Sequence, residues 1–343
     1  IRGQGRATTV KKSSDVILFD LSGSHPASTT TVTKQGQVIE DITLDGGDIG
    51  TQPLIRCYYT SMAMFKNVVF WGNPGPAVDG VEWWDSYFIN CRFDHTGGRA
   101  GTGVPSVWIR GTNGAGSGMG HSTDNSNNIY FTDCVWESFY EGAVYYEGTA
   151  SSKANKCYMT NCKIESTLIR GFPWIKLNYT EDIVFQSVNL SAGNFDSGYS
   201  TAINLIELNE SYKTGINDVF MEFWGSTRTV TSGIKFTGNA NATSMKNITG
   251  VCSATNAPVS LIDFNTFANG SRPSNNQVEG CKWTYTSTAN PVNIKGYPGN
   301  YINKFVITPE DYGAVGDGTT NDAGNLQAMF DAVGSTTYSA TAG

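Results

Sequence analysis

A six-residue pattern of apolar and polar positions recurs along most of the chain. Each copy reads apolar, any residue, a small residue or Asn/Asp, apolar, any residue, apolar. The last three positions alternate in the way expected of a β-strand with one buried side. Clear copies start at Ile39, Phe65, Phe88, Phe131, Met159 and Phe185, and weaker copies start at Ile216, Met245 and Val278.

The spacing of these copies predicts a stack of parallel coils. Successive copies start between 23 residues (65 to 88) and 43 residues (88 to 131) apart, which fits one coil plus loops of variable length. A coil with a single apolar side cannot bury that side alone, so such coils must stack. Hairpin signals are sparse, which disfavours the alternatives of a β-sandwich or a propeller. We therefore predict an all-β fold: a right-handed single-stranded parallel β-helix, or solenoid.

The third and fourth positions of the pattern refine this prediction. The third is often Asn or Asp, whose short side chain bonds local backbone and tolerates left-handed dihedral angles. We expect a bend there, with side-chain hydrogen bonds between coils. The fourth position holds Cys91, Cys134 and Cys162, with Cys281 in a weaker copy. Seven cysteines without a CxxC pair predict buried, reduced thiols rather than a disulfide framework or a metal site.

Composition agrees with a β fold and limits the possible partners. Charged residues make up 15% of the chain, aromatic residues 12%, and 39 of the 343 residues are glycine. These values are typical of a turn-rich β protein rather than a disordered chain. The net charge of -7 argues against a nucleic-acid partner, because phosphate binding needs a basic surface. No apolar run approaches the ~18 residues of a membrane span, so we expect no membrane insertion.

The C-terminal region carries a family resemblance. Residues 310–322 read EDYGAVGDGTTND, and a helical pattern follows through Leu326, Met329, Phe330 and Val333. This segment closely resembles the opening signature of the pectate-lyase superfamily, as found in bacteriophage tailspike depolymerases. In that family the signature begins the β-helix and its short helix caps the first coil. The resemblance implies an extracellular homotrimer of the virion tail, attached to other tail proteins, that binds a bacterial surface polysaccharide.

The order of the segments departs from the family pattern. We predict the β-helix over residues 1–304 and the signature with its capping helix over residues 305–343. Either the chain is circularly permuted, with the signature returning to cap the coil at Ile1, or a second module begins here. Nine coils would make a stack of roughly 43 Å. Residues 285–307 are long enough to return along it, at ~3.3 Å per extended residue.

The repeat also predicts where catalytic groups gather. If the sixth position points inward, the seventh points outward, and three consecutive copies place Asp94, Glu137 and Glu165 there. Neighbours in this column would lie ~4.8 Å apart and alternate members about twice that. Retaining glycosidases hold two carboxyl groups ~5 Å apart, and inverting ones ~6.5–9.5 Å apart. We assign the catalytic acid and base to these three residues; the alternative is a solvated acidic face.

Nearby residues are candidates for binding substrate. Arg92 and Lys163 lie two positions before Asp94 and Glu165, where they would either pair with the carboxylates or hold an acidic sugar. Flat aromatic faces pack well against sugar rings, although many aromatic residues of a solenoid are simply core. The aromatic candidates are Trp83, Trp84, Tyr145, Tyr146 and Trp174.

The long interval between two copies is a further candidate. It is the glycine-rich insertion over residues 97–128, and it would wall a groove just after Asp94. His95 and His121 are weaker candidates for a catalytic base.

The sequence is compatible with three functions. The first is an endo-acting glycoside hydrolase on a bacterial surface polysaccharide, without a cofactor or resident metal, and this is the one we predict. The second is a polysaccharide lyase, which would need a Lys or Arg base near an acidic sugar and often uses Ca²⁺. The third is a receptor-binding spike without catalysis. Reaction products separate them, because a lyase creates an unsaturated sugar and a hydrolase does not.

Overall fold

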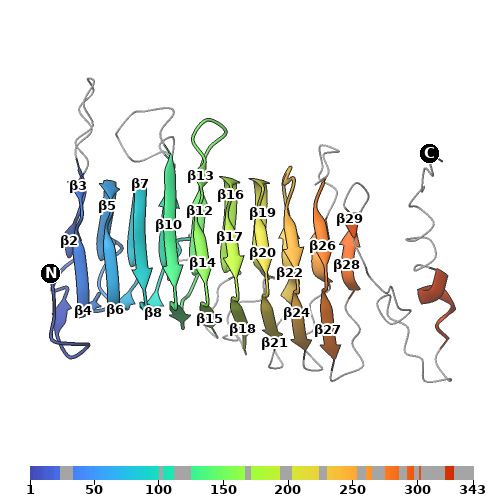
Figure 1. Cartoon of the computed structure of the whole chain (residues 1–343). Helices are drawn as coiled ribbons and strands as arrows, with labels where there is room; N and C mark the ends of the chain where they lie inside the picture. Colours follow the sequence, from blue (N-terminus) through green and yellow to red (C-terminus); the bar gives the residue numbers. More distant parts are fainter. Residues whose placement is uncertain are drawn as a thin grey trace.

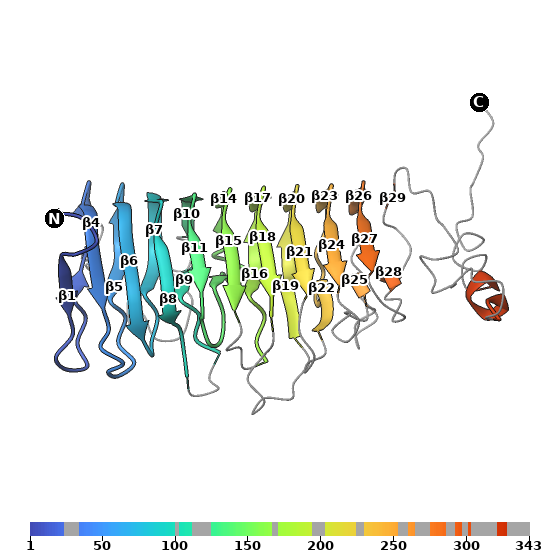
Figure 2. The ribbon, with the colours of Figure 1, turned by 90° about the horizontal axis from the view of Figure 1, so that it is seen from below.

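The computed structural model is almost entirely β-structure (Figure 1). It describes residues 1–23, 34–99, 103–111, 125–166, 171–193, 203–223, 230–252, 260–264, 275–285, 292–296, 301–302 and 321–327. These residues form 29 strands in one hydrogen-bonded network, and every pairing among them is parallel. Figures 1 and 2 show the strands stacked side by side, with the chain progressing from one end of the stack to the other. The predicted parallel pairing is therefore confirmed.

Each pass of the chain, here called a rung, adds strands to three faces, which we number in chain order within a rung. Face 1 comprises β2 (Phe19–Asp20), β5 (Ile55–Ser61), the start of β7 (Val78–Ile89), β9 (Val107–Arg110), β12 (Val144–Glu147), β16 (Ile175–Glu181), β19 (Ile203–Tyr212), β22 (Val230–Phe236), β25 (Ser260–Phe264) and β28 (Val292–Gly296). The short strands β3 (Lys34–Gln35) and β13 (Ala154–Asn155) pair at the corner that follows face 1.

Faces 2 and 3 carry the six-residue pattern. Face 2 comprises the starts of β4 (Val38–Asp45) and β6 (Met64–Asn73), the ends of β7 and β10 (Ser126–Thr132), and β14 (Tyr158–Thr160), β17 (Val184–Gln186), β20 (Gly215–Asn217), β23 (Ser244–Lys246), β26 (Gln277–Glu279) and β29 (Tyr301–Ile302). Face 3 comprises β1 (Thr9–Lys11), the ends of β4 and β6, β8 (Arg92–Thr96), β11 (Val135–Glu137), β15 (Lys163–Ser166), β18 (Asn189–Ala192), β21 (Phe220–Phe223), β24 (Thr249–Cys252) and β27 (Lys282–Tyr285).

Apolar positions of the pattern stack into columns inside the rungs. In the copy that starts at Phe88, the first, fourth and sixth residues are all buried, and the same holds in the other clear copies. Phe88 lies 4.7 Å from Phe131 between ring centroids, and Phe93 lies 4.8 Å from Trp136, with the rings of each pair stacked nearly parallel. Each rung thus buries its apolar side against the next rung, and this burial stabilises the stack.

The third position of the pattern is a left-handed corner between faces 2 and 3. Every clear copy has a positive φ there: Asp41 (55°), Asn67 (54°), Asn90 (51°), Asp133 (56°), Asn161 (53°) and Ser187 (56°). Side chains bond from rung to rung, since the Asn90 amide donates to Asn67 and the Asn67 amide to Asp41, both at 2.8 Å. The predicted bend and the predicted bonds between coils are both confirmed, and the residue choice follows from the tolerance of Asn and Asp for this conformation.

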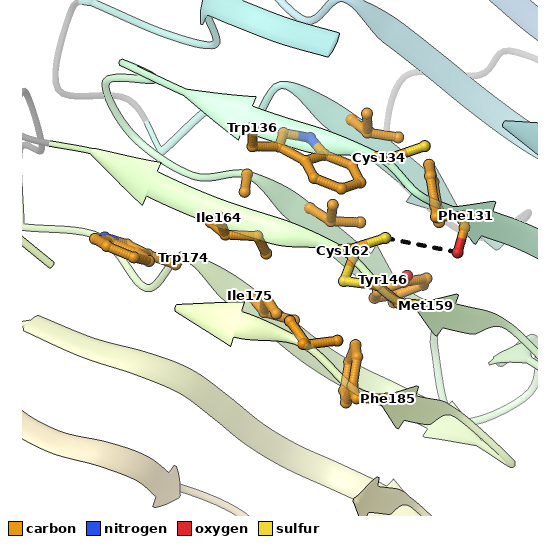
Figure 3. Close-up of a cluster of buried hydrophobic side chains, with 14 of the residues drawn as sticks. Phe131, Cys134, Trp136, Tyr146, Met159, Cys162, Ile164, Trp174, Ile175 and Phe185 are labelled. Atoms are coloured by element: carbon orange, nitrogen blue, oxygen red, sulfur yellow. Dashed lines mark hydrogen bonds between the residues drawn. The ribbon is translucent and has the colours of Figure 1, made fainter. Parts of the chain in front are cut away.

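The cysteines of the fourth position form a buried ladder of free thiols. Cys91, Cys134 and Cys162 are buried in neighbouring rungs and are not in disulfides. Figure 3 shows Cys134 and Cys162 among Phe131, Met159 and other core side chains, with the Cys162 thiol directed at the Phe131 carbonyl oxygen at 3.6 Å. Burial raises the pKa of Cys134 and Cys162. This ladder matches the prediction for those three residues.

The C-terminal signature falls mostly outside the described residues. Within it, residues 323–327 form a single turn of helix. Figures 1 and 2 draw that turn beyond the last rungs, at the end of the stack opposite Ile1.

Candidate functional site

Face 3 lines up the three carboxylates. The strand register pairs Trp71 with Asp94, Asp94 with Glu137, and Glu137 with Glu165. The preceding residues, Phe93, Trp136 and Ile164, are fully buried. The alternation of a strand therefore turns the carboxylates to the outer side of face 3. The geometric part of the prediction, one column on consecutive rungs, is confirmed.

The three carboxylates differ in exposure. The side chain of Asp94 is 4% exposed, that of Glu137 26% and that of Glu165 28%. Asp94 accepts hydrogen bonds from Arg92, through Nη2 at 2.8 Å and Nε at 3.1 Å. Glu137 and Glu165 are accessible to a ligand, whereas Asp94 lies beneath its partners.

Two cations lie along the carboxylate column. Arg92 forms an ion pair with Glu137 as well as with Asp94, so its guanidinium bridges two rungs. Lys163 forms an ion pair with Glu165. Of the two roles open to Arg92 and Lys163, the structure therefore shows charge pairing with the column.

A histidine and two aromatic rings extend the column toward the end of β8. His95 Nδ1 lies 2.6 Å from Asp94 Oδ1, and its ring centroid lies 5.0 Å from that of Trp71 and 6.3 Å from that of Tyr140. Trp71 is 43% exposed, which is unusual for a large apolar side chain. An exposed aromatic ring next to carboxylates is the arrangement that packs against a sugar ring.

The structure separates the aromatic candidates. Trp83, Tyr146 and Trp174 are fully buried in the core, and Figure 3 shows Tyr146 and Trp174 among other core side chains. Fully buried rings have no surface for a polymer, so assigning these three to substrate was wrong. They lie on face 1 or at its ends, where the six-residue pattern gives no direction.

Tyr145 and Trp84 lie away from the column. Tyr145 is buried, so assigning it to substrate was wrong as well, whereas Trp84 is partly exposed. Tyr145 is 2% exposed on the outer side of face 1, and its hydroxyl lies 3.1 Å from both the Glu141 and Pro173 carbonyl oxygens. Trp84 is half-buried near the corner after face 1, 6.4 Å from the ring of Tyr59. Half of the glycine-rich insertion over residues 97–128, including His121, lies outside the described residues.

The described part of the chain contains no cluster of three or more His, Cys, Asp or Glu residues arranged to hold a metal ion. Over the same residues, we find no helix with the length and apolar character needed to traverse a bilayer.

Comparison with known proteins supports the fold. No protein-family model and no curated protein matches the sequence. ORF18 of Geobacillus virus E2 is similar in structure, with a TM-score of 0.56 and 14% identity over 83% of this chain and 48% of that one. The chain thus spans about half the length of that structure, and at this identity the likeness shows the fold alone.

Two other solved structures align more weakly. The Streptococcus pneumoniae surface adhesin PfbA has a TM-score of 0.46 and 10% identity, over 82% of this chain and 78% of that one. Tailspike protein 3 of bacteriophage CBA120 has a TM-score of 0.41 and 12% identity, over 87% of this chain and 53% of that one. Both likenesses are too low to carry an argument.

Proposed function

We propose that this chain is a glycoside hydrolase that cleaves a bacterial surface polysaccharide at the carboxylate column of face 3. The observation that supports the proposal is the register that pairs Glu137 with Glu165 on neighbouring strands, both partly exposed. Neighbouring strands lie ~4.8 Å apart, close to the ~5 Å separation of the two carboxyl groups of a retaining glycosidase. The exposed ring of Trp71 would hold a sugar beside them.

The roles of the two glutamates follow from their partners. Glu137 contacts Arg92, a side chain that stays charged, so it suits the nucleophile that attacks the anomeric carbon. Glu165 would then protonate the departing glycosidic oxygen. In the second step Glu165 would take a proton from the water that releases the sugar from Glu137. Asp94, buried under Arg92 and His95, would position both rather than touch the sugar.

This assignment makes a demand on Lys163. A general acid must carry a proton, so the contact between Lys163 and Glu165 has to open when substrate arrives. The Lys163 side chain is 44% exposed, and ion pairs at such exposure contribute about 0–1 kcal/mol. A bound sugar would therefore displace the ammonium group at little cost.

The wider setting is proposed from the sequence signature. The parallel rungs fit a right-handed single-stranded β-helix, because parallel crossovers are almost always right-handed. Residues 1–304 would form that unit and residues 305–343 the signature with its capping helix. The resemblance of residues 310–322 to the tailspike signature supports an extracellular homotrimer of a virion tail, held by other tail proteins.

The test combines a substrate panel with three matched variants. Wild-type protein is incubated with bacterial capsule, O-antigen and wall polysaccharides, and the fragments are analysed by mass. Glu137→Gln and Glu165→Gln should each lower the cleavage rate by at least about a hundredfold, the usual contribution of a positioned acid or base. Glu222→Gln is the control, because Glu222 follows in the same column beyond Ser191, to which it is bonded at 3.0 Å. Its rate should stay near wild type.

A non-catalytic binding spike is the second candidate, and the ion pairs of Glu137 and Glu165 favour it. Paired carboxylates are a stable surface for recognition and need no proton transfer. A polymer from the panel that binds tightly and is recovered uncut would support this candidate and contradict the hydrolase. Fragments with the ultraviolet absorbance of an unsaturated sugar would instead identify a lyase.

A further inference from the structure

A hollow of about 500 Å³ lies where the rungs turn from face 3 into face 1. Residues of three turns border it, residues 51–53 after β4, residues 74–76 after β6, and residues 98, 99 and 104 after β8, together with the first strands of face 1. Its charged and aromatic lining consists of Arg56, Tyr58, Asp79, Arg99 and Trp108. Two of these side chains, Arg56 and Arg99, are cations.

The one acidic side chain of this lining is already saturated. Asp79 accepts a hydrogen bond from the Tyr58 hydroxyl at 2.7 Å and is paired with Arg110, whose Nη2 lies 2.7 Å from Oδ2 and 2.8 Å from Oδ1. Burial, with Asp79 adding to it, raises the pKa of Tyr58 to about 12, so its hydroxyl keeps the proton it donates. The negative charge of Asp79 is therefore balanced before any ligand arrives.

The ion-pair partners of Arg56 and Arg99 are both exposed to solvent. Arg56 lies 3.5 Å from Asp20, whose side chain is 49% exposed, and Arg99 lies 2.6 Å from Asp48, which is 61% exposed. Ion pairs with such exposed partners contribute little and exchange readily with solvent. In both arginines Nε is shielded from solvent and has no hydrogen-bond partner among the described residues. An unsatisfied buried donor is costly, and an anion in the hollow would satisfy it.

We propose that the hollow between Arg56 and Arg99 binds the acidic group of a sugar, a carboxylate or a phosphate substituent on the polysaccharide. The planar guanidinium presents paired N–H groups that match carboxylate and phosphate oxygens. The Trp108 ring would cover the sugar itself. Its Nε1 donates to Glu147 at 2.6 Å, and the Arg110 guanidinium lies 4.7 Å from its centroid, so the ring is held in place.

The hollow is connected to the carboxylate column. The Arg99 guanidinium lies 4.4 Å from the centroid of Tyr140, and Tyr140 contacts His95, which is bonded to Asp94. Arg99 itself follows Asp94 by five positions on the same pass of the chain. A polymer lying on face 3 could thus place an acidic residue in the hollow. That the hollow is a subsite of the hydrolase rests on the proposed function, whereas its binding of an acidic sugar is independent of that function.

The test measures binding of small probes, independently of cleavage. Glucuronate, galacturonate, N-acetylneuraminate and glucose 1-phosphate are titrated to millimolar concentration and followed by ligand-observed NMR. Glucose is the matched neutral probe, because it differs from glucuronate only in carrying a hydroxymethyl group in place of the carboxylate. At least one acidic probe should bind saturably while glucose does not. The probe that binds distinguishes a carboxylate from a phosphate substituent.

Arginine variants locate the binding site. Arg56→Met and Arg99→Met should each weaken binding about tenfold to a hundredfold, the range for losing hydrogen bonds to a charged group. Arg56→Lys should lose part of this affinity, because the charge stays but the planar donor pair is gone. Arg6→Met, which removes an exposed arginine elsewhere, should change binding less than about twofold, since distant exposed charges are screened.

The outcomes separate the two proposals. Glu137→Gln should lower the cleavage rate by at least about a hundredfold and leave probe binding intact. If the wild-type protein binds an acidic probe but cleaves no polysaccharide of the panel, the hydrolase proposal is overturned and the acidic-sugar site stands. The site itself is overturned if no acidic probe binds saturably, if glucose binds equally well, or if Arg6→Met weakens binding as much as Arg56→Met and Arg99→Met.

Discussion

The contact between Arg92 and Asp94 offers a quantitative test of how the carboxylate column is held. Asp94 lies almost entirely out of solvent, and Arg92 gives it two hydrogen bonds within the same strand. Arg92→Met would leave this carboxylate with its hydrogen bond to His95. Asp94→Asn keeps the shape and an accepting oxygen but removes the charge. The double variant removes both sides of the pair.

The magnitude follows from burial and geometry. Removing one partner of a fully buried ion pair costs about 3–5 kcal/mol. Arg92 is 40% exposed, so solvent screens part of the interaction, and we expect about 2–3 kcal/mol for Arg92→Met. Asp94→Asn should cost about 1–2 kcal/mol, because an amide oxygen still accepts hydrogen bonds. The double variant should cost less than the sum of the two by about 1–2 kcal/mol.

Urea denaturation of the four proteins, followed by tryptophan fluorescence, measures this coupling. The slope of unfolding free energy against urea must stay constant across the set, so that changes in midpoint report stability. If the two single changes add to within about 0.5 kcal/mol, the value typical of independent sites, Asp94 is not held by Arg92. Its proposed positioning role would then be abandoned.

Three further predictions concern the stack itself. First, Asn90→Ala should lower the free energy of unfolding by about 1–2 kcal/mol in denaturation, because Ala in a left-handed corner is strained and the hydrogen bond to Asn67 is lost. Asn90→Gly should cost less than about 1 kcal/mol, since glycine adopts this φ without strain. A larger loss for Asn90→Gly than for Asn90→Ala would refute the strain. Cys134 should escape alkylation in the folded protein and react after unfolding, as mass mapping would show, because it is buried with a raised pKa. Hydrogen bonds from Lys213 and then Lys153 lower the pKa of Glu181. Its stabilisation, about 0.5 kcal/mol, is present above the ordinary Glu pKa and lost as pH falls through the lowered one. A gap in stability between wild type and Glu181→Gln that stays undiminished down to about pH 2, far below the ordinary Glu pKa, would contradict this.

The repeat made much of the fold predictable, because each of its positions has a separate physical reason. Apolar side chains at the first, fourth and sixth positions face the core, and the third position, as at Asn90, adopts the left-handed conformation. Because consecutive residues of a strand point to opposite sides, an inward side chain at the sixth position means an outward side chain at the seventh. Asp94, Glu137 and Glu165 were placed correctly on one column for that reason.

Face 1 shows why part of the site could not be predicted. No repeat covers it, so neighbouring residues such as Tyr145 and Tyr146 carry no sign of which one points inward. The structure turns Tyr146 into the core and Tyr145 to the outer side, where Lys176 lies 5.5 Å from the Tyr145 ring centroid. Proximity in sequence to the carboxylates was therefore a poor guide. Alternation along the strand decides which side chain points inward, and applying it requires knowing where the strand begins and ends.

The hollow lies where the turns between faces 3 and 1 differ in length from rung to rung, and such differences can be read from the sequence. Residues 74–77 join β6 to β7, whereas residues 97–106 join β8 to β9, one rung later. The four-residue turn thus lies between longer turns, residues 46–54 in the rung before it and residues 97–106 in the rung after it, and residues of all three turns line the hollow with Arg56. A turn much shorter than its neighbours on both sides therefore marks where a stack of this kind can open a binding site.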